Sequence, residues 1–234
     1  MPDYAHIEQL LTGALGLRRR PIAVAFRETV PPGVAAFTGS LPSGCSFWKL
    51  AAEGRSFYTV PGDHFNCPIG SYTHNIPLPP DREPELRQTL AWMTEIGYLR
   101  MDEVPGIPRL PVTPGVIVYA PLADTPVEPD TVMVVGEPGR LMLLHEAATR
   151  SGIAVQPLFG RPTCMAIPAS LTDAVVSSMG CVGNRMYTGL SDSELYASVS
   201  GKQLGAVAEQ LVTIVAANVV LSTYYEQRRI ALTT

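Results

Sequence analysis

The sequence has 234 residues, of which 46% are hydrophobic and 16% charged, and its formal net charge is −4. This composition is typical of a globular protein, and a chain of this length buries roughly 70% of the surface that its unfolded form exposes. It therefore needs neither a disulfide nor a metal merely to fold. The longest basic run is Arg18–Arg20. Because nucleic-acid binding usually needs a clustered basic face, it is not expected here.

The first residues carry an early acid and lack the basic start and apolar core of a signal peptide. No apolar run reaches the roughly 18 residues of a membrane span. The nearest run, residues 211–221, is shorter and contains Asn218. We therefore expect a cytoplasmic protein without a membrane span. In that compartment cysteines serve as metal ligands, reactive thiols or buried core residues more often than as disulfides.

The first part of the chain predicts alternating helices and strands. Apolar residues at helical spacing indicate helices, and short β-branched or aromatic runs indicate strands. In chain order we expect a helix over residues 5–17, a buried strand over 21–26, a short helix over 46–52, a strand over 56–60 and an amphipathic helix over 81–97.

Four prolines between residues 105 and 114 predict a rigid connector. We expect one compact domain over residues 1–234, with halves over 1–104 and 115–234 joined by this connector. The second half predicts strands over 115–119, 131–135 and 153–158, helices over 140–150 and 168–178, and a long C-terminal helix over 203–227.

The strand–helix–strand order of residues 131–158 is typical of a crossover unit and favours the α/β class, with α+β as the alternative. The C-terminal helix is apolar almost all round between residues 211 and 221, so we expect it to be buried in the core or at a subunit interface. A homodimer through this helix is the expected assembly.

Each of the four cysteines lies beside Gly, Pro or Thr, at a turn that precedes a short helix. Both halves run in the order apolar strand, turn, cysteine, short helix, cysteine, which suggests an internal duplication that gathers the thiols at one site. Helix N-termini favour thiolates, and neighbouring glycines allow the backbone to approach a bulky group. The four cysteines are Cys45, Cys67, Cys164 and Cys181, and the neighbouring glycines are Gly44, Gly70, Gly180 and Gly183.

Four thiolates bind either a tetrahedral zinc ion or an iron–sulfur cluster. No Cys-x2-Cys pair occurs, so the zinc-ribbon and ferredoxin loop patterns are absent, and ligands from four separate turns suit a cluster held between two halves. His64 precedes Cys67 by three residues, while Arg161 and Arg185 lie near the other cysteines and could offset a tetrathiolate's charge. Buried structural thiols, a redox disulfide and a catalytic thiol remain as alternatives.

Four sequence blocks contain the cysteines. They are Gly44-Cys45-Ser46-Phe47-Trp48, His64-Phe65-Asn66-Cys67-Pro68-Ile69-Gly70, Arg161-Pro162-Thr163-Cys164 and Gly180-Cys181-Val182-Gly183-Asn184-Arg185. These blocks resemble the signature blocks of domain-of-unknown-function family 169, a group of uncharacterised archaeal and bacterial proteins. The resemblance extends over residues 21–200, with the blocks in the expected order. It implies that the blocks form the family's common site, with the cysteines as its central residues and His64, Arg161 and Arg185 around them.

Three functions fit these observations. The first is a cytoplasmic metalloprotein with a [4Fe–4S] cluster that serves in electron transfer or as a redox accessory, with a redox partner protein or small molecule. The second is a binding protein or enzyme for a small organic ligand or haem-type tetrapyrrole, with thiols and His64 lining a cleft between the halves. The third is a non-catalytic dimeric partner subunit with structural zinc or free thiols. The sequence does not decide whether the protein is an enzyme.

Overall fold

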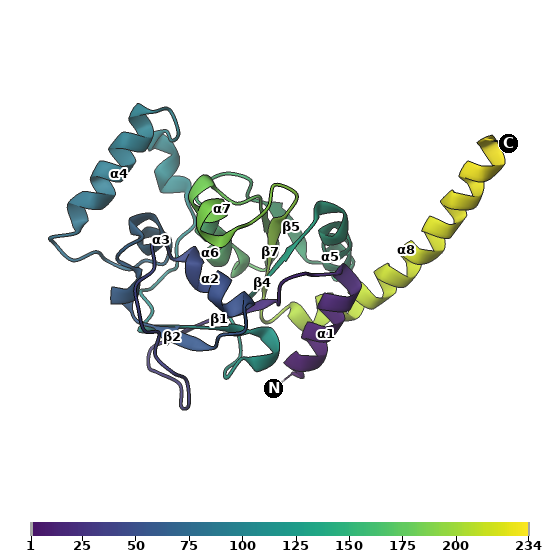
Figure 1. Ribbon diagram of the computed structural model, residues 1–234, viewed down its shortest axis with the longest axis horizontal. Helices are drawn as coiled ribbons and strands as arrows, with labels where there is room; N and C mark the ends of the chain where they lie inside the picture. The colour runs from purple at the N-terminus through teal and green to yellow at the C-terminus, as the bar shows by residue number, and fades with distance from the viewer. Residues whose placement is uncertain (1, 234) are drawn as a thin grey trace.

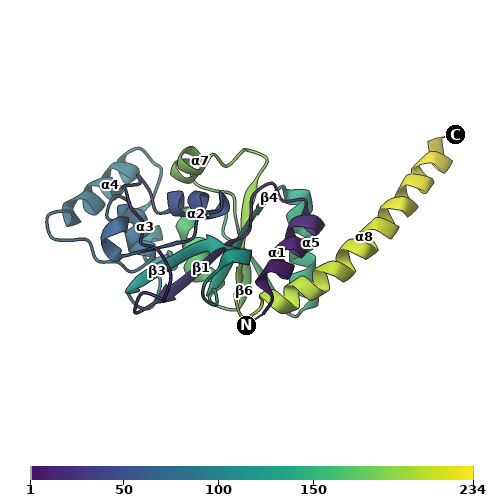
Figure 2. The same ribbon diagram turned by 60° about the horizontal axis from the view of Figure 1, so that its bottom comes forward.

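A computed structural model describes residues 2–233 of the protein. Its centre is a seven-stranded sheet in the order β2-β3-β1-β4-β7-β6-β5, with helices packed on both faces (Figures 1 and 2). The predicted α/β class is confirmed. The strands are β1 (Ile22–Arg27), β2 (Phe57–Thr59), β3 (Val116–Pro121), β4 (Thr131–Gly136), β5 (Ala154–Pro157), β6 (Ala174–Ser178) and β7 (Leu195–Ser200).

The α-helices lie before, between and after these strands. Short 3₁₀ segments supplement them, notably η4 (Thr163–Met165). The α-helices are α1 (Tyr4–Leu15), α2 (Cys45–Ala52), α3 (Pro68–Thr73), α4 (Glu83–Glu95), α5 (Pro138–Arg150), α6 (Ala166–Ser170), α7 (Val182–Thr188) and α8 (Leu204–Thr233).

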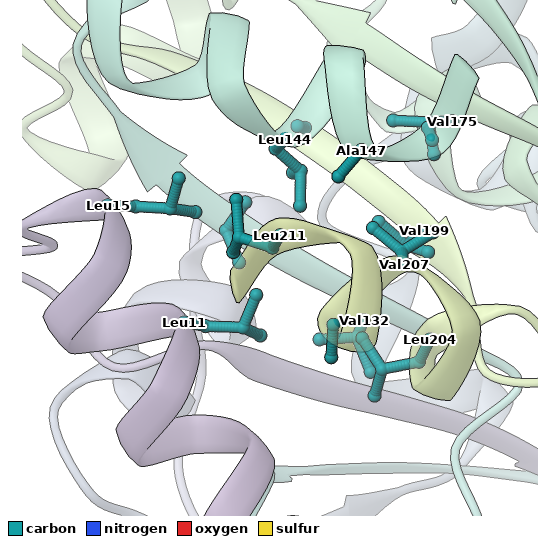
Figure 3. Close-up of a cluster of buried hydrophobic side chains, with 14 of the residues drawn as sticks. Leu11, Leu15, Val132, Leu144, Ala147, Val175, Val199, Leu204, Val207 and Leu211 are labelled. Carbon is teal, nitrogen blue, oxygen red and sulfur yellow. The ribbon is translucent and has the colours of Figure 1, made fainter. Parts of the chain in front are cut away.

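Alternation along the strands divides the core into two layers. In β1, Ala23 joins one apolar cluster while Ile22 and Val24 join the other, as period-two side-chain placement requires. The first cluster lies under α1, α5 and the beginning of α8 (Figure 3). The second cluster contains Phe47 and Trp48 of α2 and lies on the side of the sheet that carries the cysteines.

The two predicted halves share this one sheet. β3, which follows the proline-rich segment, lies between β2 and β1 and pairs antiparallel with both. β4 and β5 are joined through α5 and run parallel, with β7 and β6 between them, so residues 131–157 form a crossover connection. The internal duplication stays a prediction.

The helix predicted over residues 168–178 is wrong. The helix α6 ends at Ser170, and β6 begins at Ala174 after a turn in which Asp173 has a φ of 62°. Val175 and Val176 are β-branched and fully buried between neighbouring strands, where such residues pack well. The strand β7 was not predicted from the sequence at all.

The C-terminal helix is longer than predicted and is only partly packed. One face of its first part is buried, and beyond Asn218 every described side chain is exposed; the buried residues are Leu204, Val207, Ala208, Leu211 and Ile214. Figures 1 and 2 both show this second part of α8 extending away from the body of the protein. The expected burial of residues 211–221 in the core is therefore wrong for most of that run, and a subunit interface remains as the other predicted environment.

By length and composition, α8 is also the one helix among residues 2–233 that is apolar enough to cross a membrane. Of its most apolar stretch of 18 residues, 28% is buried against the rest of the protein. The sequence pattern had predicted no such span. α4 is the other projecting helix and has no buried residue, despite its amphipathic pattern.

Candidate functional site

The four cysteines occupy four helix starts on the same side of the sheet. Cys45 is the first residue of α2, Cys67 is the N-cap of α3, and Cys181 is the N-cap of α7. Cys164 lies in η4, directly before α6. Backbone N–H groups at a helix start are unpaired within the helix and favour a negative charge nearby. Burial acts against this local effect, because it raises the pKa of the Cys45, Cys67 and Cys164 thiols.

Local sequence explains the best defined of these positions. Pro68 takes the first position of α3, where no backbone N–H is needed. The helix then turns back so that the Gly70 N–H donates to the Cys67 Sγ at 3.3 Å. On the neighbouring helix start, the Ser43 hydroxyl lies 3.2 Å from the Cys45 Sγ. Both sulfurs thus sit in a polar lining that the turn residues create.

The thiols lie near enough to one another to interact electrostatically. Burial raises the pKa of Cys45 to about 11, and the charges of Cys67 and Cys181 act in the same direction. Burial also raises the pKa of Cys164 well above its ordinary value, and each of the other three cysteines adds to this effect. The structure therefore brings the four predicted residues into one neighbourhood, where bringing several thiolates together requires a compensating positive charge.

All four thiols are free, and only Cys45 is buried, with 9% of its surface exposed. Cys67, Cys164 and Cys181 are half-buried. A group held by these thiols would consequently lie close to solvent and to any protein that docks over it.

Two of the four predicted glycines are required by their surroundings. A Cβ on Gly70 would lie 2.9 Å from the Cys67 Sγ, closer than real Cβ contacts. Gly180 has a φ of +79°, and a Cβ there would lie 2.7 Å from Leu190. In contrast, a Cβ on Gly44 would come no closer than 3.7 Å to His64, and one on Gly183 no closer than 3.9 Å to Tyr187.

Beside the thiols lies a buried group of rings. The ring centroid of His64 lies 4.9 Å from that of Phe47, 5.9 Å from that of His74 and 6.5 Å from that of Tyr119. His64 Nε2 bonds to the Thr59 hydroxyl at 2.8 Å. Burial lowers the pKa of His64 to about 3, so its imidazole is neutral near pH 7.

Several buried polar atoms of this region have no hydrogen-bond partner among residues 2–233. Such atoms are rare in folded proteins, because an unpaired buried polar group costs roughly 1–3 kcal/mol. A water molecule or another polar group beside them would remove this cost. The atoms are His64 Nδ1, His74 Nε2, Trp48 Nε1, the Tyr119 hydroxyl and Asn184 Oδ1.

Sequence reasoning missed Tyr119 and Asn184. Tyr119 lies on β3, and burial raises its pKa, with further contributions from the charges of Cys164, Cys45 and Cys67. A tyrosine at the inner position of an otherwise aliphatic strand was the signal that could have found it. Asn184, on α7, donates to the Tyr196 hydroxyl at 3.3 Å.

The two predicted arginines make other contacts. The Arg161 guanidinium lies over the Tyr98 ring, 3.9 Å from its centroid. Arg185 donates to the Ser191 carbonyl at 2.6 Å and to the Met179 carbonyl, and so holds the loops around α7. In the described part of the chain, neither guanidinium has a hydrogen bond to a cysteine. Their predicted role in offsetting thiolate charge stays a prediction.

Within residues 2–233 no group of three or more His, Cys, Asp or Glu side chains is arranged to hold a single metal ion. A tetrahedral zinc with sulfur ligands at about 2.3 Å requires sulfur atoms about 3.8 Å apart. The thiols therefore share a neighbourhood without closing around one ion. A multinuclear cluster occupies more space, so it accepts ligands that stand farther apart.

Comparison with known proteins places this site in a family. A sequence model of the uncharacterised ArCR proteins, domain of unknown function 169, matches residues 10–210. The chain belongs to this family. The family segment includes all four cysteines and ends before the projecting part of α8.

One curated relative shows how far the similarity extends. The chain is similar to the uncharacterized protein MJ0308 of Methanocaldococcus jannaschii, with 25% identity over 201 residues. The alignment covers 79% of this chain and 82% of that protein. No solved structure matches the chain significantly.

Proposed function

We propose that the protein is a metalloprotein that holds a [4Fe–4S] cluster at Cys45, Cys67, Cys164 and Cys181. The observation that carries this proposal is the set of four free thiols at four helix starts, coupled to one another electrostatically. When bound, such a cluster supplies one-electron redox chemistry.

The polar lining of the site suits a large anionic group better than it suits four uncharged thiols. The Gly70 N–H already points at the Cys67 sulfur. The unpartnered donors beside the thiols include the Trp48 N–H and the Tyr119 hydroxyl. Hydrogen bonds to cluster sulfurs adjust the reduction potential, so these residues have the chemistry to hold and tune the group.

The raised pKa values of the thiols are a second reason to expect a bound metal. Without a metal, Cys45 is a neutral thiol near pH 7, because burial raises its pKa to about 11. Metals bind the thiolate, and binding therefore releases protons. The positive charge of iron offsets the repulsion that keeps four neighbouring thiolates from forming alone.

Ligation by four protein thiols leaves no open iron position, which favours electron transfer over Lewis-acid catalysis. We propose a redox partner protein or a small redox molecule as the other reactant. Cys67, Cys164 and Cys181 are half-buried, so a cluster bound there would lie close to a partner that docks on the surface. A cytoplasmic location remains part of this proposal.

The test is a set of four single cysteine-to-serine variants prepared without oxygen and reconstituted with iron and sulfide. Each variant should lose most of the broad visible absorbance and bound iron of the parent while its far-ultraviolet circular dichroism is unchanged. Ser193→Ala, at an exposed position in the loop before β7, is the control and should retain both. Stoichiometric zinc without visible absorbance in the parent, or variants that keep all their iron, would refute the proposal.

A further inference from the structure

Two apolar surfaces of the protein are exposed and lie next to each other. One is the projecting part of α8, from Val219 to Leu232, whose large apolar side chains are about half exposed or more. The other is a groove of about 770 Å³ between α5, β5 and the end of β6, which reaches Ile214 where α8 leaves the body. An exposed apolar surface of this extent marks an interaction site.

The length of the projecting segment argues against a lipid bilayer as its environment. The apolar run ends at Tyr225, since Glu226, Arg228 and Arg229 follow, and α8 is anchored in the core as far as Ile214. At 1.5 Å per residue the free apolar part spans about 17 Å. The hydrocarbon core of a bilayer is about 30 Å thick, so this part is too short to cross it.

The area of the surface fits a protein partner. The side chains of Val219, Val220, Leu221, Tyr224, Tyr225 and Leu232 are between 47% and 74% exposed. A standard stable interface buries about 800 Å² on each partner, and large exposed apolar and aromatic side chains beside an apolar groove are the kind of surface that supplies it. A surface used by two identical copies in the same way needs no further component.

Charged residues at the two ends of the free segment favour one orientation of two α8 helices packed together. The free end of α8 carries the exposed Arg228, which donates to the Tyr224 hydroxyl at 3.5 Å but has no acidic partner in the described part of the chain, whereas Arg229 is paired with Glu226 at 2.6 Å. At the other end of the free segment, the exposed Glu146 of α5 accepts from the Asn218 side chain at 3.5 Å. If two copies of α8 run antiparallel with Tyr224 at the crossing, Arg228 of one copy lies within a helical turn of Asn218 of the other.

We propose that the protein forms a two-fold symmetric dimer in which the projecting part of each α8 packs antiparallel against the other copy's α8 and groove. Arg228 of each copy then meets Glu146 of the other. Tyr224 and Tyr225 lie at the centre, where aromatic side chains contribute most to an interface. A parallel pair would instead place Arg228 against its own counterpart.

Charge reversal on the full-length protein tests the pairing, with the dimer dissociation constant measured by sedimentation equilibrium. Arg228→Glu and Glu146→Arg should each weaken the dimer about tenfold or more, and the double variant should recover most of the loss. Lys202→Glu makes the same charge change at an exposed position before α8 and should leave the constant unchanged. Circular dichroism verifies that every variant is folded.

Three results would overturn the proposal. The first is a parent protein that is monomeric at micromolar concentrations. The second is a dimer that both single charge reversals leave intact, because the pairing then runs through other residues. The third is a monomer that floats with vesicles of phosphatidylcholine and phosphatidylglycerol, since α8 would then serve as a lipid-binding segment.

Discussion

At the scale of single residues, the sharpest constraint lies between Gly70 and Cys67. A Cβ on Gly70 would lie 2.9 Å from the Cys67 sulfur, so Gly70→Ala must displace the thiol or the start of α3. We expect this variant to lose bound iron and to unfold with a free energy lower by about 1–3 kcal/mol. Iron analysis and urea denaturation measure the two effects.

Gly183→Ala is the matched control, because Gly183 also lies in a short helix that begins at a cysteine. A Cβ there would meet only Tyr187, at 3.9 Å. Both substitutions carry the same gain in helix propensity, so that contribution cancels in the comparison. Similar behaviour of the two alanine variants would show that the space around the Cys67 sulfur is not restrictive.

The buried histidines predict a loss of stability in acid. Burial lowers the pKa from 6.5 to about 3 for His64 and to about 4 for His74. Between those values and 6.5 the unfolded chain binds protons that the folded protein does not, so stability falls as the pH falls below 6.5. From pH 7 to pH 5 the two residues together lower the free energy of unfolding by about 4 kcal/mol.

Urea denaturation of metal-free protein across this pH range measures the effect. The double variant His64→Gln/His74→Gln should have a smaller pH dependence. His6→Gln, at an exposed position of α1, is the control and should keep the parent's dependence. A parent stability that does not change between pH 7 and pH 5 would contradict the assignment of both imidazoles as neutral and buried.

The local setting of the thiols could be predicted from the sequence because helix starts are encoded by neighbouring residues. Cys67-Pro68 and the glycines around it suffice to place a cysteine at an N-cap. The approach of Tyr119 to His64 could not be predicted in this way. It depends on the pairing of β3 with β2, in which Tyr119 lies opposite Phe57, and no local pattern specifies that pairing.

At the scale of elements, α8 consists of an anchored part and a free part. Leu211 is fully buried against α1 and α5, whereas the adjacent Val212 is 54% exposed. Leu211→Ala should lower the free energy of unfolding by about 3 kcal/mol through the cavity it leaves. Val212→Ala should change it by less than about 0.5 kcal/mol. Chemical denaturation of both variants at one protein concentration tests this boundary, and equal losses would contradict it.

Helical periodicity predicted α1, α2 and α5 well because each has an apolar face that meets the sheet. It failed over β6, where apolar residues at 171, 174 and 175 imitate helical spacing while β-branched side chains pack between strands. It also could not tell where α8 leaves the core. An all-round apolar helix has no preferred face, so its burial depends on partners that the sequence of one chain does not specify.

At the scale of the whole molecule, one sheet carries a polar thiol site on one side and an apolar helical layer on the other. The thiol site is built from α2, α3, η4 and α7, while α1, α5 and α8 form the layer that extends into the proposed dimer contact. The two proposals therefore depend on opposite faces. Loss of the dimer by Arg228→Glu should leave iron binding intact, and loss of iron by Cys67→Ser should leave the dimer intact.

The measurement that tests the four-thiol metal site most directly is quantitative iron and acid-labile sulfide analysis of protein purified and reconstituted without oxygen. The proposed [4Fe–4S] site predicts four iron atoms and four sulfides per chain, together with a broad brown absorbance that bleaches on reduction. A colourless protein that contains neither element after reconstitution would contradict the proposal.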